Sequence, residues 1–210
     1  MGEPLLNTFM ATPLGHYLFG LALAAGLARD GRERAHGPWL AAVACVPDLD
    51  VIPGLVVGDP SRFHHGVTHS LTAAVLFAGA FAALGTWAGR RATARLVVLV
   101  AVLYASHSVL DALTLDLSDP RGVPLLWPWR DTTYESPWLL LPNVQHTREP
   151  VVSAHNALLM VREAVVFLPL IGLVRAVRGC RGAWAAAATW IYASCFAAAT
   201  AVSVASLPTR

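Results

Sequence analysis

The amino-acid sequence predicts an all-α integral membrane protein, a bundle of about six transmembrane helices with one Pro/Trp-rich extracytoplasmic loop. Hydrophobic residues make up 56% of the 210 residues and charged residues only 13%, whereas soluble domains are close to a quarter charged. The mean hydropathy is +0.55. Because so little polar surface cannot cover a water-facing globule, disordered and collagen-like classes are excluded, and the lipid bilayer is the expected solvent.

Six apolar stretches match the length that a membrane requires. A hydrocarbon core about 30 Å thick is spanned by about 17 to 25 helical residues. We therefore expect helices at roughly 13–28, 38–57, 67–89, 95–115, 155–174 and 183–207. The third and sixth are the clearest because they are long and carry no charge. No internal repeat is present, so a single membrane-embedded domain over 1–210 is expected.

The first stretch is interpreted as a retained helix, because only Glu3 and no Lys or Arg precedes it, unlike a signal peptide. Small residues recur in several stretches and let helices approach closely in lipid. In the third stretch they are Ala73, Ala74, Ala78, Gly79, Ala80 and Ala82. A closely packed bundle is expected.

The arginines predict the orientation of the bundle. All fifteen basic residues are Arg, and nine of them follow the first, third and fifth stretches, while five lie on the opposite side. Short cytoplasmic loops accumulate basic residues, so we predict that the nine are cytoplasmic and that both termini are outside. The nine are Arg29, Arg32, Arg34, Arg90, Arg91, Arg95, Arg175, Arg178 and Arg181. No basic tract indicates nucleic-acid binding, and membrane lipids are the expected partners.

Residues 116–154 differ in composition from the spans. They contain six prolines and three tryptophans, Trp127, Trp129 and Trp138. Proline at this frequency prevents a regular helix, and tryptophan favours the headgroup level. We expect an ordered extracytoplasmic loop that lies over the bundle.

Ionisable side chains inside the spans are the main functional signal. Each costs a few kcal/mol by insertion scales and marks a functional site by default. Five of these side chains lie twelve to twenty-one residues along the chain from the nearest arginine of the basic side. They are His16, Asp48, His69, His107 and Asp111. At about 1.5 Å per residue this is roughly 18 to 32 Å. The four segments therefore bring these groups to one level, in the outer half of the bilayer.

The spacing within the spans favours a metal site. His107 and Asp111 are four residues apart and share one helical face. Asp48 and Asp50 could not share a face of a regular helix, but they follow Pro47, where we expect the helix to unwind.

The histidines before the third span are also suitably spaced. His65 and His69 are four apart, and His64 could join His69 through the non-helical backbone that Gly66 permits. Imidazole with carboxylate is the ligand set of a catalytic zinc ion, or of manganese or iron. Several carboxylates buried at one level also need cations or protons to be tolerated.

Other polar groups receive structural interpretations. Arg162 and Glu163 are neighbours in sequence, so they point in different directions and are expected to meet different partners. Single histidines elsewhere are interpreted as core or interface residues, namely His36, His146 and His155. The cysteines lack paired spacing, so no disulfide or thiolate zinc site is predicted, and buried inert thiols are expected at Cys45, Cys180 and Cys195.

Five blocks of sequence resemble the YdjM-like family of LexA-regulated, inner-membrane, metal-dependent hydrolases. The resemblance covers about residues 12–130. The blocks are Gly15-His16, Pro47-Asp48-Leu49-Asp50, the run from His64 to Ser70, His107 with Asp111 and Thr114, and the run from Gly122 to Pro128. The family pattern has His-Arg-Gly where this chain has His64-His65-Gly66. His65 is therefore either an added ligand or a substitute polar group.

The resemblance implies a bacterial inner membrane protein, distantly similar to zinc-dependent phospholipases C and related nucleases. Phosphodiester hydrolysis is then the expected reaction, on a lipid or another amphiphilic phosphoester. The candidate metal ligands are His16, Asp48, Asp50, His64, His69, His107 and Asp111, for one or two ions, with zinc favoured over manganese or iron. The candidate catalytic residues are Asp50, as bridging ligand or general base, and His65.

Two other functions use the same side chains. A metal-ion or proton-coupled transporter, or a metal-binding membrane protein, would relay ions through these His and Asp residues. Bis-His haem binding would leave the carboxylates without a role. The oligomeric state is left open by the sequence.

Overall fold

The computed structural model describes residues 11–58, 62–90, 92–117, 120–142, 153–179 and 183–207. These residues form helices and irregular loops, and in these ranges the only β-type pairings are isolated bridges between Thr114 and Leu141 and between Val123 and Tyr134. The helices are α1 Pro13–Leu27, α2 Gly31–Ala41, α3 Val51–Val56, α4 Leu71–Trp87, α5 Ala94–Ala112, α6 Ala154–Gly179 and α7 Ala183–Ala205. The all-α prediction is confirmed.

Four helical segments are long and apolar enough to cross a membrane. They are Glu33–Val56, Ala94–Ala112, Ala154–Gly179 and Ala185–Ala205. The helices α1 and α4 are also apolar but have 15 and 17 residues, or about 22 and 26 Å at 1.5 Å per residue. A multi-helix membrane protein is thus the observed fold class.

The second expected span, 38–57, is not one regular helix. α2 ends at Ala41, two 3₁₀ turns follow at η1 (Ala42–Cys45) and η2 (Pro47–Asp50), and α3 is a short helix. Pro47 has no N–H to continue the α-helical bonding. The unwinding that we expected at Pro47 is therefore present.

The third expected span, 67–89, also starts differently. A 3₁₀ turn, η3, covers Val67–His69, and α4 starts at Leu71. The hydroxyl of Ser70 accepts a hydrogen bond from the Ala73 N–H and caps this helix. The chain therefore breaks its helical path at two of the four segments that carry the clustered His and Asp residues.

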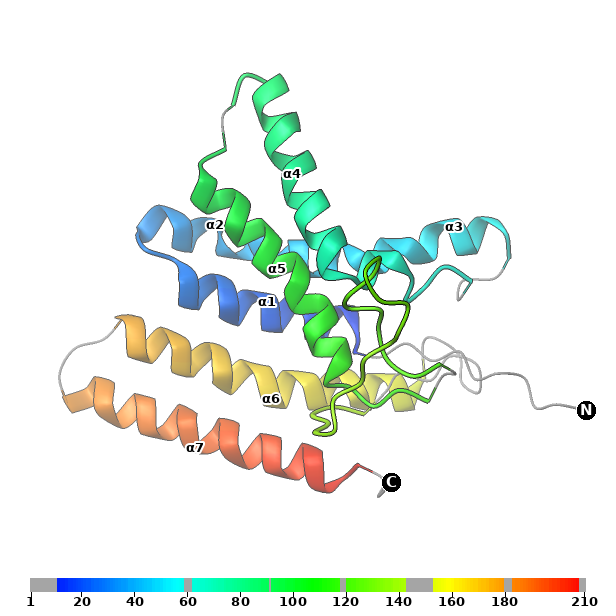
Figure 1. The fold of residues 1–210 in the computed structure, drawn as a ribbon. Helices are drawn as coiled ribbons and strands as arrows, with labels where there is room; N and C mark the ends of the chain where they lie inside the picture. Colours follow the sequence, from blue (N-terminus) through cyan, green and yellow to red (C-terminus); the bar gives the residue numbers. More distant parts are fainter. Residues whose placement is uncertain are drawn as a thin grey trace, which may run out of the picture.

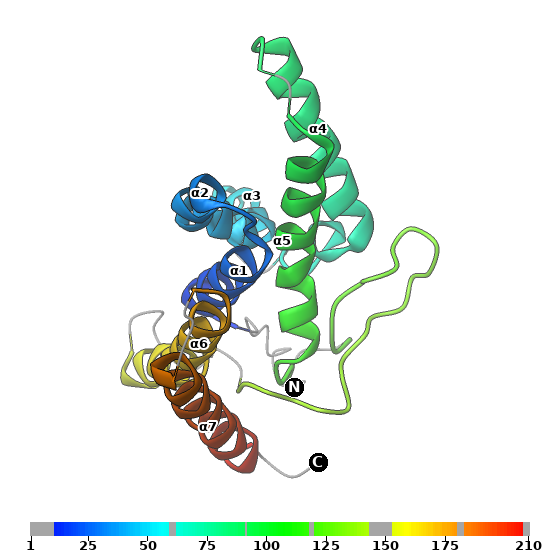
Figure 2. The same ribbon diagram turned by 90° about the vertical axis from the view of Figure 1, so that its left-hand side faces the viewer.

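α1 is at the centre of the arrangement. It packs against α2, α5 and α6, and α6 packs against α7. Figure 1 shows α7, α6, α1 and α2 following one another, while α4 and α5 form a steeply inclined hairpin. In the view turned by 90° α4 projects beyond the other helices (Figure 2). The end of α1, the start of α5 and the end of α6 lie together, because Arg95 and Arg178 both donate to carbonyls at the end of α1; we call this the arginine end.

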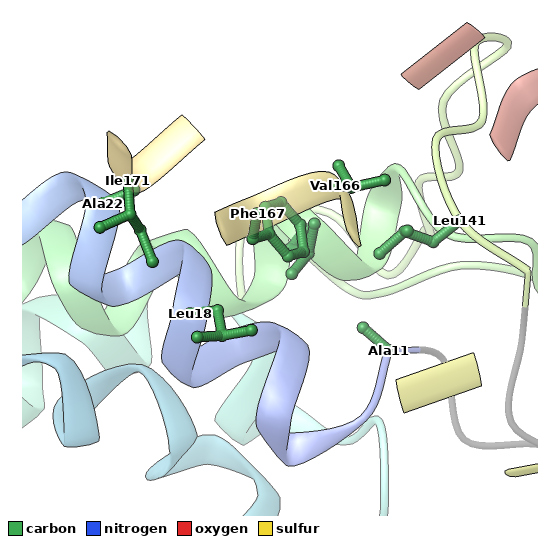
Figure 3. Close-up of a cluster of buried hydrophobic side chains, with 8 residues drawn as sticks. Ala11, Leu18, Ala22, Leu141, Val166, Phe167 and Ile171 are labelled. Carbon is green, nitrogen blue, oxygen red and sulfur yellow. The ribbon is translucent and has the colours of Figure 1, made fainter. Parts of the chain in front are cut away.

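Apolar packing joins α1 to α6. Leu18 and Ala22 of α1 meet Phe167 and Ile171 of α6 in a buried cluster (Figure 3). On another side of α1, a Cβ on Gly20 would lie 2.8 Å from the Cβ of Ala44. The unwound segment can thus lie directly against α1 because glycine occupies this position.

The proline-rich segment is an irregular loop fastened to the bundle end opposite the arginine end. The N–H of Leu115 donates to the carbonyl of Leu141, and the N–H of Leu71 donates to the carbonyl of Leu125, at 2.9 and 3.0 Å. The Thr72 hydroxyl donates to the carbonyl of Trp127 at 2.5 Å. These bonds hold the described loop residues, 113–117 and 120–142, against the ends of α4 and α5.

One expectation about the cysteines is wrong. Cys195 is exposed on α7 rather than buried, because it borders open hollows between α6 and α7 and is not packed into the core. Cys45 is partly buried. Cys180 lies outside the described residues.

Candidate metal centre

His16 enters the centre from the first turn of α1. Thr12 caps this helix, with its hydroxyl accepting a hydrogen bond from the Gly15 N–H. The His16 ring is 1% exposed and stacks on the ring of His107, with 3.6 Å between ring centroids. Its Nε2 lies 3.2 Å from Oδ1 of Asp111. A helix start thus places an imidazole against the face of α5.

His107 and Asp111 lie on one face of α5 and are buried. Nε2 of His107 is 3.1 Å from Oδ2 of Asp111. Nδ1 of His107 donates to the carbonyl of Ala44 at 2.7 Å. This bond puts the ring proton on Nδ1, so Nε2 presents its lone pair to the centre. In a 3₁₀ turn the Ala44 carbonyl would accept a hydrogen bond from the N–H three residues later. That residue is Pro47, which has no N–H, so the Ala44 carbonyl is available to His107.

Asp48 and Asp50 come from the 3₁₀ turn η2 and have different surroundings. Oδ1 of Asp48 lies 3.3 Å from Nε2 of His107 and 3.9 Å from Nε2 of His69. The Asp48 side chain is 21% exposed, while that of His69 is fully buried. Asp48 therefore stands at the more open side of the centre.

Asp50 has hydrogen-bond partners at both carboxylate oxygens. Its Oδ1 accepts from Nδ1 of His64 at 2.8 Å, and its Oδ2 accepts from the Thr68 hydroxyl at 2.6 Å. Nδ1 of His69 is 3.3 Å from the same Oδ2. One carboxylate thus faces Nδ1 of two histidines, an arrangement that directs their Nε2 atoms away from it.

The segment from His64 to Ser70 turns tightly to present three imidazoles. His65 has a positive φ of 59°, which is uncommon for a residue with a side chain. A Cβ on Gly66 would lie 2.9 Å from the Phe63 carbonyl oxygen, so this turn requires glycine. Burial, with His64 and His69 close by, holds the pKa of His65 well below its usual value, so this ring is neutral at neutral pH.

The donor atoms of these segments converge. Nε2 of His69 and Nε2 of His107 are 3.0 Å apart, and Oδ2 of Asp111 is 3.6 Å from the former. In the part of the chain that the structure describes, three sets of side chains have ligand atoms within 4.8 Å of one another. They are His69, His107 and Asp111; His16, Asp48 and His107; and His64, His65 and His69.

Two buried atoms of this cluster lack a hydrogen-bond partner. Oδ2 of Asp111 and Nδ1 of His16 have none among the described residues. A buried carboxylate oxygen without a donor is costly unless a cation compensates it. Nitrogen and carboxylate donors around one point are suited to a divalent transition metal. The buried His and Asp groups could thus hold a metal ion.

Several groups support the cluster without any sequence signal that marks them. The Tyr104 hydroxyl donates to the Thr68 carbonyl at 3.0 Å and fixes the turn before His69. Glu163 of α6 accepts hydrogen bonds from the backbone N–H and the hydroxyl of Thr12. A Cβ on Gly15 would lie 2.7 Å from the Glu163 carboxyl group. Glu163 was noticed only as a charge in a span, yet it supports the start of α1 directly before His16.

The remaining histidines stand apart from these groups. His36 is exposed on α2, and His155 lies near the start of α6. Neither is a member of the three sets of potential ligands. His146 lies outside the described residues.

Comparison with known proteins agrees with this architecture. The sequence model of the family described as YdjM inner membrane protein matches residues 10–206. The chain belongs to this family. Within the chain, 106 residues are 34% identical to Inner membrane protein YbcI of Escherichia coli (strain K12), covering 47% of this chain and 57% of the relative. The chain thus matches little more than half the length of this curated relative, and no solved structure matches it.

The YdjM match confirms the resemblance seen in the sequence motifs and extends it over almost the whole chain. Together with the apolar helices it identifies a multi-pass inner membrane protein. The His and Asp segments all lie within the matched region.

Proposed function

We propose that this YdjM-family protein is a metal-dependent hydrolase that acts on a phosphoester with a lipid-like part. The observation that carries the proposal is the buried approach of Nε2 of His69, Nε2 of His107 and the Asp111 carboxylate, at 3.0 to 3.6 Å from one another. Zinc is the favoured ion for this donor set, with manganese and iron as the other candidates.

The proposed ligands come from the three sets of side chains whose ligand atoms lie within 4.8 Å of one another. His69, His107 and Asp111 form the inner set, and Asp48, His16 and His64 complete it. When bound, a divalent cation would supply the positive charge that activates water and stabilises charge on the phosphoryl oxygens.

The chain's own groups would keep the ligands oriented and receive a proton. Asp50 holds the Nδ1 protons of His64 and His69, and the Ala44 carbonyl holds that of His107. His65 is a candidate acceptor for the proton of the attacking water because its ring lies beside those of His64 and His69. Asp50 remains the other candidate base, acting through its bonded histidines.

Exposed apolar side chains near Asp48 favour an amphiphilic substrate. Leu49 and Ile52 are 56% and 52% exposed, and Phe63 and Val67 are 43% and 49% exposed. The Arg62 guanidinium lies 5.6 Å from the centre of the Phe63 ring. This combination of apolar surface with one cation suits a phosphoester that carries hydrocarbon.

The metal-binding end is proposed to face the extracytoplasmic side, on the basis of the arginine distribution. Cysteines introduced near residues 33, 92 and 179, in a background without the native cysteines, should be protected from a membrane-impermeant thiol reagent added outside cells. Cysteines near residues 60 and 130 should react. The reverse pattern would move the site to the cytoplasmic leaflet.

The decisive experiment compares turnover with transport. Purified protein is treated with a chelator, reloaded with zinc, manganese or iron, and assayed on phospholipid and on an artificial phosphodiester. Metal-dependent turnover is expected from the parent protein and from His36→Ala, but not from His69→Ala. Ion flux into liposomes without turnover would contradict hydrolysis and favour the transporter.

A further inference from the structure

A cavity with polar groups lies away from the His/Asp cluster, between α1, α2 and α6. Its volume is about 470 Å³. Three arginines line it, Arg34 from α2 and Arg175 and Arg178 from α6, together with apolar atoms of Leu21 and Ala25 from α1. Within the ranges that the structure describes, no aspartate or glutamate lines it. It belongs to the arginine end of the bundle, because Arg175 and Arg178 are in the last turns of α6.

Hydrogen bonds to the backbone fix the position of Arg178. Its guanidinium donates to the carbonyl of Gly26 at 2.5 Å and to the carbonyl of Ala28. These carbonyls belong to the end of α1, where backbone acceptors lack helical partners. Arg178 therefore stabilises the α1 terminus and holds one positive charge at the cavity wall.

Arg34 and Arg175 are exposed and remain available for a ligand. Among the residues that the structure describes, no carboxylate forms an ion pair with either of them, whereas Glu33 pairs with Arg95 at 2.8 Å. Three guanidinium groups around one cavity without an acid are expected to attract an anion. Guanidinium binds phosphate oxygens through paired N–H donors.

The rest of the lining indicates which anion fits. Leu21, Ala25 and Pro38 present apolar surface beside the arginines. Trp39 is adjacent to Pro38 in the chain and is 81% exposed, as is typical of a tryptophan at the headgroup level. A ligand with a phosphate and an apolar part would satisfy both kinds of wall.

We propose that this cavity binds the phosphate-bearing headgroup of an anionic phospholipid. The phosphate lies among Arg34, Arg175 and Arg178, and the glycerol and first acyl carbons lie on Leu21 and Ala25. Basic pockets between transmembrane helices are suited to such headgroups. This site is separate from the proposed metal centre and does not depend on hydrolysis.

The test measures lipid binding to the full-length protein purified in a neutral detergent. Phosphatidylglycerol, phosphatidylcholine and inorganic phosphate are titrated separately, and retained lipid is counted by native mass spectrometry while the melting temperature is recorded. The parent protein is compared with the double variant Arg34→Gln/Arg175→Gln. Arg178 is left intact because it supports the end of α1. Arg90→Gln is the matched control, since Arg90 is exposed in the turn between α4 and α5 at the same end.

Phosphatidylglycerol should bind and raise the melting temperature of the parent and of Arg90→Gln, and phosphatidylcholine should have a weaker effect. The double variant should bind phosphatidylglycerol at least about tenfold more weakly, since each Arg near an anionic surface contributes to binding. Equal binding by the double variant would overturn the proposal. Stabilisation by inorganic phosphate as large as that by the lipid would show a simple anion site and overturn the assignment to phospholipid.

Discussion

Ionisable side chains are buried at one end of this bundle and exposed at the other. At the His/Asp end, His69, His107 and Asp111 are at most 1% exposed and contact one another. At the arginine end, Arg34 and Arg175 are exposed, and Arg95 pairs with Glu33 while both are partly exposed. Buried charges require partners or a cation, whereas exposed charges are solvated. The first end could therefore hold a metal ion, whereas the charges of the second end are open to solvent.

Backbone geometry differs in the same way. The segments that carry Asp48 and His69 are 3₁₀ turns. At the arginine end, α2 starts with an ordinary cap, in which Asp30 accepts from the Glu33 N–H and Glu33 accepts from the Arg29 N–H. Irregular backbone at membrane depth is tolerated where it is buried in protein. The irregularity thus marks the end where function is expected.

The largest effect should follow removal of an inner ligand. His69→Ala or Asp111→Ala should lower metal affinity by at least about a hundredfold, because groups that merely orient ligands already cost 10- to 100-fold. Metal content of the purified variants, measured by elemental mass spectrometry, checks this. His36→Ala, at an exposed position, should keep the parent's metal content. Equal metal in all three variants would remove the distinction between the buried cluster and the exposed histidine.

A smaller effect is expected from substitution of Asp50, whose carboxylate contacts Nδ1 of His64 and of His69. Asp50→Asn should retain at least one ion but lower turnover by about 10- to 100-fold, since its carboxylate orients His64 and His69. Asp48→Asn, in contrast, should lower metal affinity about as much as loss of an inner ligand, because Oδ1 of Asp48 lies 3.3 Å from Nε2 of His107. Full turnover by Asp50→Asn would show that this residue is only structural.

Two glycines of α1 test how closely the His/Asp end is packed. Gly15→Ala should destabilise the protein by about 1–3 kcal/mol, because the new Cβ would lie 2.7 Å from the Glu163 carboxyl group. Gly26→Ala is the control, since its Cβ would meet only Val174, at 3.6 Å. Thermal unfolding in detergent compares them. A Gly15→Ala protein as stable as Gly26→Ala would mean that Glu163 moves away freely.

The smallest effect is expected at the arginine end. Glu33→Gln removes the partner of Arg95 in a partly exposed pair, and such pairs contribute little because water and salt screen them. Metal content and turnover should equal those of the parent, and the melting temperature should change little. A large loss of bound metal in this variant would show that the two ends are coupled.

Several features of the site could be predicted from the sequence because they depend on local spacing. His107 and Asp111 share a helical face through their separation of four residues, and Pro47 predicted the loss of regular helix before Asp48. The composition predicted the membrane fold, since the apolar content of the chain decides whether water or lipid is its solvent. The expected span 38–57 was too regular, because hydropathy does not report 3₁₀ turns.

Other features depended on packing between distant segments. The bond from His107 to the Ala44 carbonyl joins residues 63 positions apart, and the bond from Thr12 to Glu163 joins residues 151 positions apart. No periodicity in the sequence encodes such pairings. They arise from the packing of η1 against α5 and of α6 against the start of α1.

The sequence by itself determined the solvent, the approximate spans and the residues available for a metal, because each depends on composition or on spacing along one helix. Only the tertiary structure decided that Nε2 of His69 faces Nε2 of His107 and that Asp50 contacts the Nδ1 atoms of two histidines. It also decided that Arg34 and Arg175 line one cavity. These are relations between side chains of separate segments. Their physical cause is the close approach of helices, which is set by packing in three dimensions.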